Sequence, residues 1–485
     1  MDGDLTEDST QGRAPRWVPL ALLGAVALSV VLGIYRIRAK QLWYDEAFTA
    51  LAAGRGPAGA LRVAHVLDAN MPLYIFGVSI WRLFGDGEAT LRLLSVVAAA
   101  AGVVAVYLLA ARLFDRVTGV LAAYLVAIAP FSVRYSQELR GYTFLLFFGA
   151  ASTYLFVVAI ETRRTRWFVV YTLVTAAGFY AHLAVAFVVV AQVVSLVVLA
   201  RSRIPGRKLA MSAVSGAVLL LPLLYFIAVA ADNRGTPEPP NLRSVPRYLA
   251  NAAGGVGLAL VLGALALVPL WMLWVELREG DHSLRTWHLA VVASGIVTPV
   301  VGLLVNAIVQ GRSWSDRYLI VVLPFLVIAA AVGLRRVPRP LPVVVMLVVI
   351  VVLSGLKIRH WYYGPSLQDY QGAVAFVAAE VGPDDGILFC SPYERVGFEY
   401  YALQLPADER PQPLSPDDPW SRFLNVTPVS RERAATWRTG PDRIWVLPYD
   451  DYLRSGLCQD EDLLAGRTRT VRRDFGTTTV ERWDR

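Results

Sequence analysis

The sequence predicts an α-helical membrane protein with about eleven transmembrane helices and a small C-terminal α/β domain outside the membrane. Of its 485 residues, 56% are hydrophobic and only 17% are charged, and the mean hydropathy is +0.49. Soluble domains carry about a quarter charged residues. Apolar runs of about 20 residues, the length needed to cross a bilayer, recur along the first 356 residues. These observations together favour a helical membrane bundle over a series of soluble domains.

Eleven apolar stretches are candidate membrane helices. They cover residues 17–35, 92–111, 117–130, 143–160, 167–181, 183–200, 209–231, 248–275, 289–309, 318–334 and 341–356. A long loop, residues 36–91, separates the first two. Its aromatic-rich segments are too short to cross a bilayer, and this is typical of helices that lie at the membrane interface. Such a loop can roof a cavity at the membrane surface.

The composition changes after residue 356. An amphipathic helix is expected over 367–380, buried strands over 386–390 and 443–447, and a strand pair over 469–483. The Pro- and Asp-rich stretch 406–419 is predicted to be a loop. The chain therefore divides into a membrane domain, residues 1–356, and an α/β domain, residues 357–485.

The distribution of charge predicts the orientation in the membrane. Residues 1–356 hold 30 basic and 18 acidic residues, whereas residues 357–485 hold 16 and 20. With a cytoplasmic N-terminus, the inside loops carry 16 Arg and Lys in 55 residues and the short outside loops carry 7 in 40. Cytoplasmic loops collect Arg and Lys. An odd number of helices then places the α/β domain outside, and the basic excess requires no nucleic-acid partner.

The chain has only two cysteines, Cys390 and Cys458, and both lie in the predicted outer domain. Two cysteines are too few for a disulfide scaffold or a four-ligand zinc site. An oxidising compartment permits a disulfide between them. The alternative is a pair of unrelated buried thiols.

Two clusters of carboxylates and arginines on the predicted outer side are not explained by the membrane architecture. Asp45 and Glu46 follow the first helix, and adjacent carboxylates near a hydrocarbon boundary are costly to ionise. Their plain interpretation is a solvated pair that caps the next helix. The segment 134–142 places Glu138 between two arginines, and pairing of Glu138 with Arg134 or Arg140 would be its structural explanation.

Two further outer turns carry polar groups. His182 lies between two apolar stretches and would usually be a structural residue, as would Asn70 in the long loop. Arg317 lies at another helix mouth beside Asp316, where a self-contained ion pair is the alternative. Four such clusters on one side of the membrane favour a shared cavity with carboxylates for proton abstraction and guanidinium groups for an anion.

Sequence signatures of soluble enzymes are absent, including G-x-x-x-x-G-K-[ST], G-x-G-x-x-G after a strand, G-x-S-x-G and H-E-x-x-H. A nucleotide bound to this chain is therefore not expected as its energy source. A transferase on the outer face would need a donor already carried across the membrane on a lipid.

The chain resembles a known family in its ordered motifs. They are Leu42-Trp-Tyr-Asp-Glu-Ala47, Asn70-Met-Pro-Leu-Tyr74 with Leu83-Phe-Gly85 and Leu91-Arg-Leu93, Arg134-Tyr-Ser-Gln-Glu-Leu-Arg-Gly-Tyr142, Tyr180-Ala-His182 and Asp316-Arg-Tyr-Leu319. Together they resemble bacterial C-type (GT-C) membrane glycosyltransferases, in the family 39 branch related to protein O-mannosyltransferases and aminoarabinose transferases. Leu139, Gly141 and the Asn70-Met71 pair depart from the usual pattern of that branch.

The resemblance implies an inverting glycosyltransferase that moves a hexosyl or pentosyl unit from a polyprenyl phosphate to a glycan, lipid or protein of the cell envelope. The bacterial cytoplasmic membrane would be its location. Asp45, Glu46 and Glu138 are the catalytic candidates. Arg140, His182 and Arg317 are the candidates for binding the donor phosphate. The remaining candidates, for substrate contacts, are Tyr44, Asn70, Tyr74, Tyr135, Gln137 and Tyr318.

No cofactor is required by this chemistry, although Asp45 and Glu138 are the candidate ligands if a divalent cation takes part. The rival function is a transporter or flippase for a polar or glycosylated lipid. It would use the same charged cavity without chemistry, and broken helices or an internal repeat would favour it.

Overall fold

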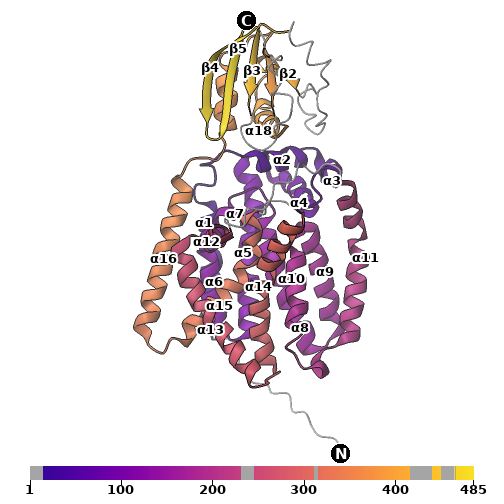
Figure 1. Ribbon diagram of the computed structural model, residues 1–485, viewed down its shortest axis with the longest axis vertical. Helices are drawn as coiled ribbons and strands as arrows, with labels where there is room; N and C mark the ends of the chain where they lie inside the picture. Colours follow the sequence, from indigo (N-terminus) through magenta and orange to yellow (C-terminus); the bar gives the residue numbers. More distant parts are fainter. Residues whose placement is uncertain are drawn as a thin grey trace, which may run out of the picture.

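The computed structural model describes residues 15–230, 245–310, 315–390, 392–415, 440–448, 464 and 466–485. It consists of a helical bundle with a five-stranded sheet at one end, and α2 and α3 lie beneath the sheet (Figure 1). The predicted fold class is confirmed: the chain is a multi-pass membrane protein with a small C-terminal strand domain.

Each of the eleven predicted apolar stretches contains a helix. These are α1 (Trp17–Ile34), α5 (Glu88–Leu113), α6 (Arg116–Ala127), α8 (Tyr142–Thr162), α9 (Thr165–Ala181), α10 (Val185–Ser195), α11 (Gly206–Ala230), α13 (Val256–Arg278), α14 (Leu284–Gln310), α15 (Leu323–Arg336) and α16 (Pro340–Tyr363). Backbone polar groups in a bilayer have no water to bond, so an apolar segment of this length folds as a helix.

Eleven full crossings are not confirmed, because several of these helices are short. Within the described residues, seven helices are long and apolar enough to cross a membrane, and α6 with α7 (Pro130–Ser136) forms an eighth candidate bent by 59°. α10 has 11 residues and α15 has 14. At 1.5 Å per residue, neither spans the roughly 30 Å hydrocarbon core. The hydropathy of the sequence predicts only the length of an apolar stretch. A helix can end within such a stretch, so the helix is shorter than the stretch.

Short helices occupy the loop between α1 and α5. They are α2 (Tyr44–Ala53), α3 (Gly56–Val66) and α4 (Pro72–Trp81), followed by the 3₁₀ turn η1 (Arg82–Phe84). Two further short elements, α12 (Val245–Ala253) and η5 (Asp316–Val321), precede α13 and α15. α2 packs against the C-terminal domain and η5 packs against α8 and α12. The predicted site residues lie on these short elements, on α7 and on the turns beside them.

The C-terminal sheet has the strand order β2-β1-β3-β5-β4. Its strands are β1 (Gly386–Phe389), β2 (Gln412–Ser415), β3 (Arg443–Leu447), β4 (Thr468–Phe475) and β5 (Thr478–Asp484). β1 is parallel to β2 and β3, and β5 is antiparallel to β3 and β4. Helices α17 (Tyr370–Ala378) and α18 (Pro392–Ala402) complete the described domain, with a short turn, η6 (Ala407–Glu409), after α18.

The prediction of a loop over 406–419 is wrong at β2. Pro413 has no N–H to donate, which disfavours a strand in a sequence pattern but is tolerated at the edge of a sheet. β2 is that edge strand, and it pairs only with β1.

The α/β domain is packed onto the loop helices rather than tethered to them. One hydrophobic cluster includes Met71 and Tyr74 of the loop together with Phe398 and Trp445 of the domain. The hydroxyl of Tyr401 accepts a hydrogen bond from the Leu42 N–H at 2.7 Å and donates one to Glu88 at 2.8 Å. The domain therefore forms a wall beside the short helices that carry the site.

Candidate active site at the end of the bundle

The adjacent carboxylates Asp45 and Glu46 lie in the first turn of α2 but have different surroundings. Glu46 is fully buried and accepts two hydrogen bonds from Arg92, both at 2.8 Å. It accepts a third from the N–H of Leu139 at 2.7 Å. All of its strong hydrogen-bonding capacity is thus directed into the protein, which is the arrangement of a structural ion pair.

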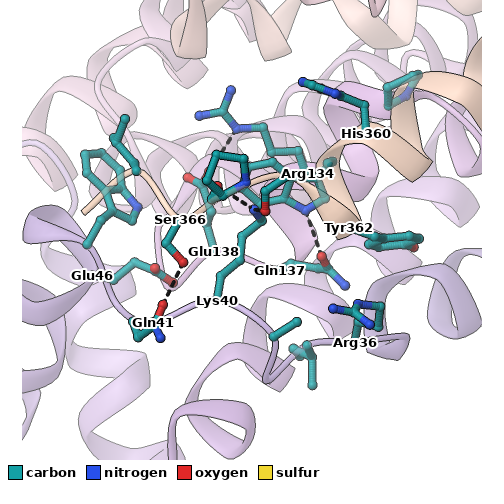
Figure 2. Close-up of a pocket in the computed structure, with 18 of the residues that line it drawn as sticks. Arg36, Lys40, Gln41, Glu46, Arg134, Gln137, Glu138, His360, Tyr362 and Ser366 are labelled. Carbon is teal, nitrogen blue, oxygen red and sulfur yellow. Dashed lines mark hydrogen bonds and ion pairs between the residues drawn. The ribbon is translucent and has the colours of Figure 1, made fainter. Parts of the chain in front are cut away.

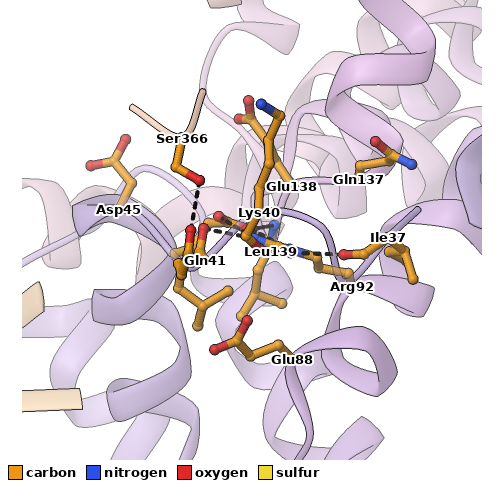
Figure 3. Close-up of polar contacts among 12 residues, drawn as sticks. Ile37, Lys40, Gln41, Asp45, Glu88, Arg92, Gln137, Glu138, Leu139 and Ser366 are labelled. Carbon is orange, nitrogen blue, oxygen red and sulfur yellow. Dashed lines mark hydrogen bonds and ion pairs between the residues drawn. The ribbon is translucent and has the colours of Figure 1, made fainter. Parts of the chain in front are cut away.

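Arg92 extends this arrangement to the backbone that leads into α2. Its guanidinium donates to the carbonyl oxygens of Ile37, Lys40 and Gln41 at 2.8–3.2 Å (Figure 3). Arg92 was not among the predicted site residues, although a guanidinium inside an apolar stretch is a signal that a buried partner exists. The Glu46–Arg92 pair therefore ties together α2, α5 and the turn after α7.

Asp45 faces two arginines from distant parts of the chain. Its Oδ2 forms an ion pair with Nη1 of Arg317 and lies 4.0 Å from Nε of Arg140. Nη2 of Arg140 lies 3.8 Å from Asp68, which was not among the predicted site residues. We call Asp45, Asp68, Arg140, His182 and Arg317 the Asp45 cluster. It brings together one predicted catalytic carboxylate and all three predicted phosphate-binding residues.

Arg140 has few close acceptors for a buried cation. Its Nη1 is 3.3 Å from the Asp45 carbonyl oxygen and from the Thr49 hydroxyl, and its Nε is buried without a hydrogen-bond partner. A guanidinium has five N–H donors. Leaving one of them buried and unpaired is costly. The Nε of Arg140 is therefore available to a further acceptor, while the ion pairs of Arg140 with Asp45 and Asp68 are long, at 4.0 and 3.8 Å.

His182 lies in the turn between α9 and α10 and is completely buried. Its Nδ1 accepts a hydrogen bond from the Ala184 N–H at 3.1 Å, and its Nε2 lies 3.4 Å from the Asn70 amide. Burial, with Arg140 and Arg317 nearby, holds the pKa of His182 far below its usual range. His182 is therefore neutral, and it can offer one N–H but no positive charge to an anion.

Aromatic rings surround the cluster. The ring of Tyr318 is 5.3 Å from that of His182 and 6.5 Å from that of Tyr142, whose ring is in turn 4.8 Å from Tyr135. The hydroxyl of Tyr135 is buried without a hydrogen-bond partner. These rings provide a dry wall, which strengthens electrostatic interactions inside the site.

The other predicted contact residues serve the frame around the site. Tyr74 shares a hydrogen bond with Ser95 at 2.8 Å. Gln137 joins α1 to α16, since it donates to the Tyr35 carbonyl oxygen at 2.7 Å and accepts from Trp361 at 2.8 Å. Tyr44 begins α2, and its N–H donates to Gln368 at 2.9 Å. The structure places these three in positions that hold neighbouring elements together.

Glu138 lies outside the Asp45 cluster, on a cavity of about 680 Å³ between the bundle and the α/β domain (Figure 2). Its Oε1 accepts a hydrogen bond from Arg134 at 3.0 Å, whereas its Oε2 is buried and has no partner. Burial raises the pKa of Glu138 above its usual range. Lys40, Arg134, His360 and Arg36 also line this space, which we call the basic cavity.

Trp43 stands between the basic cavity and the Asp45 cluster. It lines the cavity, and the guanidinium carbon of Arg317 lies 5.1 Å from the centre of its ring. Asp316 accepts a hydrogen bond from Asn251 at 3.1 Å instead of pairing with Arg317. Glu138 therefore lines the basic cavity, whereas Asp45 does not.

The carboxylates do not form a ready site for a divalent cation. No group of three His, Cys, Asp or Glu side chains with metal-binding geometry occurs among the described residues. Asp45 is paired with a guanidinium, and the positive charges of Arg140 and Arg317 oppose a cation there. Asp45 and Glu138 alone fit the preferences of Ca²⁺ or Mg²⁺ poorly, since both ions take about six or more oxygen ligands.

Only one of the two cysteines of the predicted disulfide lies within the described residues. Cys390 directly follows β1, is buried, and is disulfide-bonded rather than a free thiol. Cys458 lies outside the described residues, so the pairing with Cys458 stays a prediction.

Known proteins show the same fold. The chain superposes on ArnT from Cupriavidus metallidurans in the apo state with a TM-score of 0.63 and 16% identity, covering 96% of this chain and 97% of that one. ArnT from the same organism bound to undecaprenyl phosphate superposes with a TM-score of 0.61 and 16% identity, covering 96% of this chain and 98% of that one. The chain also superposes on the archaeal oligosaccharyltransferase AglB from Archaeoglobus fulgidus, in complex with an inhibitory peptide and a dolichol-phosphate. The TM-score is 0.58 and the identity is 12%, and the match covers 89% of this chain and 69% of that one. No curated protein sequence matches the chain.

A family model also matches part of the chain. Residues 70–226 match the dolichyl-phosphate-mannose-protein mannosyltransferase family. This segment contains Asn70, Glu138, Arg140 and His182, whereas Asp45 and Arg317 lie outside it. The resemblance drawn from the motifs is thus confirmed, and the chain is a membrane protein with the fold of the GT-C-type glycosyltransferases.

Proposed function

We propose that this protein transfers a sugar from a polyprenyl phosphate to a hydroxyl group of an acceptor, with inversion at the anomeric carbon. The observation that carries the proposal is Arg140, a buried guanidinium whose Nε has no hydrogen-bond partner and whose two carboxylate neighbours stand 3.8–4.0 Å away, beside Arg317. Two guanidinium groups suit a phosphate, and a carboxylate suits proton abstraction from a hydroxyl.

The reaction divides among these residues. The acceptor hydroxyl attacks the anomeric carbon and gives its proton to Asp45, while the bond between that carbon and the phosphate oxygen breaks. The electrons of that bond go to the polyprenyl phosphate, whose growing charge Arg140 and Arg317 stabilise. Attack by an acceptor on the face opposite the leaving phosphate inverts the anomeric carbon in a single displacement.

The Asp45–Arg317 pair has a defined part in this mechanism. Without a donor, Arg317 holds Asp45 in an ion pair. A bound phosphate competes for Arg317 and so releases a carboxylate oxygen to accept a proton. Glu46 is a positioning residue in this scheme, because its oxygens are bonded to Arg92 and Leu139.

We also propose that the reaction takes place on the outer face of a bacterial cytoplasmic membrane, with the α/β domain outside the cytoplasm. The distribution of Arg and Lys in the loops supports this orientation. A C-terminal reporter that is active only in the cytoplasm should be silent. Strong reporter activity would contradict the topology.

The decisive experiment offers purified protein a panel of polyprenyl-phosphate hexoses and pentoses and measures the release of polyprenyl phosphate. Asp45→Asn keeps the size of the side chain but removes the proton acceptor, so turnover should fall by about 10²-fold or more. Asp86→Asn is the control, because Asp86 is exposed and pairs only with Arg82 among the described residues. Near-normal transfer by Asp45→Asn would remove Asp45 from the mechanism.

A second pair of variants tests the phosphate site. Arg140→Lys and Arg317→Lys keep the charge but lose the planar fork that binds two phosphate oxygens at once. Both variants should weaken donor binding. Donor binding and release without any sugar transfer, for every donor and acceptor offered, would instead favour the transporter or flippase.

A further inference from the structure

The helix that carries Asp45 has no N-cap side chain of its own. Trp43 occupies the N-cap position of α2, and an indole ring can donate a hydrogen bond but cannot accept one. The first N–H groups of a helix have no partner inside the helix, and a Ser, Thr, Asp or Asn side chain at the N-cap usually accepts one of them. The first turn of α2 therefore depends on acceptors from elsewhere in the chain.

These acceptors come from the α/β domain. The Tyr44 N–H, the first of the helix, donates to the side-chain oxygen of Gln368 at 2.9 Å. The Leu42 N–H, just before the helix, donates to the Tyr401 hydroxyl at 2.7 Å. The two bonds span 324 and 359 positions of the sequence. The α/β domain therefore caps the helix, which the residue at the N-cap position does not.

Residues 364–368, which link α16 to α17 and which we call the strap, also contact the turn before α2. The Lys40 ammonium group donates to the carbonyl oxygens of the first two strap residues, both at 2.9 Å. The Ser366 hydroxyl donates to the side chain of Gln41 at 2.6 Å (Figure 3). With the capping bond of α2, the turn is joined to the strap at three places, so the position of the strap decides where α2 begins.

The sheet in turn fixes the strap. The Asp369 N–H donates to the Phe475 carbonyl oxygen at 3.2 Å, and the Thr477 N–H donates to the Leu367 carbonyl oxygen at 3.0 Å. Both bonds reach the turn between β4 and β5. Gly476 in this turn has φ +64°, and a Cβ there would lie 2.7 Å from the Leu367 carbonyl oxygen. Glycine allows both this conformation and this close approach, so the β4–β5 hairpin sets the position of the strap.

We propose that the α/β domain positions the Asp45 carboxylate for proton abstraction, with Gln368 and Tyr401 as the positioning residues. The inference rests on the proposed function, which makes Asp45 the proton acceptor. Asp45 directly follows the capped residue, so loss of the cap frees its backbone. A general base must lie within about 2.6–3.2 Å of the hydroxyl, and a displacement of about 1 Å can cost about 100-fold in rate. The domain thus acts on the chemical step, whereas Arg140 and Arg317 bind the donor phosphate.

Two variants of Gln368 test the cap, and one of them is a rescue. Gln368→Met keeps the length of the side chain but removes the acceptor. Gln368→Glu keeps an acceptor and adds a negative charge, which a helix N-terminus favours. Gln368→Met should lower kcat by about tenfold with little change in the KM for the lipid-linked donor. Gln368→Glu should keep most of the wild-type kcat, and equal losses in both variants would overturn the proposal.

Two glycines test the route through the sheet. Gly476→Ala would push its new Cβ against the Leu367 carbonyl oxygen and displace the strap. Gly466→Ala is the matched control, because Gly466 has a similar φ of +78° but a Cβ there meets no atom within 4 Å. Both variants have the same kind of backbone strain, so only Gly476→Ala should lower kcat. The same kcat in both variants would contradict this route. All transfer rates are measured well below the Tm of each variant, so that unfolding does not contribute.

Hydrogen exchange of the full-length protein in nanodiscs separates the inference from the proposed function. The amides of residues 42–47 should exchange about tenfold faster in Gln368→Met and Gly476→Ala than in the wild type, and at the wild-type rate in Gln368→Glu and Gly466→Ala. Faster exchange with unchanged kcat, or unchanged exchange in Gln368→Met, would overturn the inference and leave the proposed function intact. A wild-type protein with protected amides that transfers no sugar from any donor offered would instead refute the proposed function.

Discussion

The assignment of Glu46 to the frame rather than to catalysis gives a sharp prediction for Glu46→Gln. Glu46 and Arg92 are 1% and 3% exposed, and they share two hydrogen bonds of 2.8 Å. A glutamine keeps an oxygen for one N–H, but its NH₂ group faces a guanidinium donor, and the positive charge of Arg92 is left uncompensated. Removing one partner of a buried ion pair costs about 3–5 kcal/mol.

The double variant Glu46→Gln/Arg92→Gln distinguishes a structural from a catalytic role. It removes both charges, so its free energy of unfolding should fall by about 1–3 kcal/mol less than the sum of the two single variants. It does not recover the full stability, because Arg92 also donates to the carbonyl oxygens of Ile37, Lys40 and Gln41.

Thermal unfolding in detergent, followed by tryptophan fluorescence, measures the stability, and release of polyprenyl phosphate measures the activity. Glu46→Gln should lower Tm by about 3–5 °C, because an entropy of unfolding of about 2.1 cal/mol/K per residue amounts to about 1 kcal/mol/K for a chain of this length. Activity measured well below Tm should recover in part in the double variant. Glu46→Gln with an unchanged Tm and abolished transfer would refute the reasoning and make Glu46 a catalytic residue.

Two further predictions concern stability. Burial raises the pKa of Glu394 in α18 to about 7, so the folded state prefers its protonated form, and the free energy of unfolding should fall as pH rises from about 4.5 to 7, by at most about 3 kcal/mol. Glu394→Gln should therefore raise Tm at pH 8 but not at pH 4.5, and equal Tm changes at both values would contradict this origin. Gly333→Ala in α15 should lower Tm through a loss of about 1–3 kcal/mol, because the new Cβ would lie 2.3 Å from the Leu265 carbonyl oxygen of α13. Gly263→Ala is the matched control, and a similar Tm for both alanine variants would show that the helices separate without cost.

The membrane architecture could be predicted from the sequence because hydropathy is a local property. An apolar segment of sufficient length in a bilayer must satisfy its own backbone, and each of the eleven stretches does contain a helix. The strands at 386–390 and 443–447 could be recognised for a related reason, since short apolar runs with β-branched or aromatic residues favour buried strands. The exceptions were places where packing with distant segments decides the outcome, such as the proline-containing edge strand β2.

The polar residues of the site were also visible in the sequence, because charged groups between apolar helices are costly and therefore conspicuous. Their partners were not visible. Asp45 pairs with Arg317, 272 positions away, while its neighbour Glu46 pairs with Arg92. One peptide bond separates the two carboxylates, yet successive residues of a helix point about 100° apart and meet different elements. The residue types came from the sequence, whereas the tertiary structure alone decided which carboxylate is committed to the frame and which faces the arginines, because ion pairs depend on distance in space rather than along the chain.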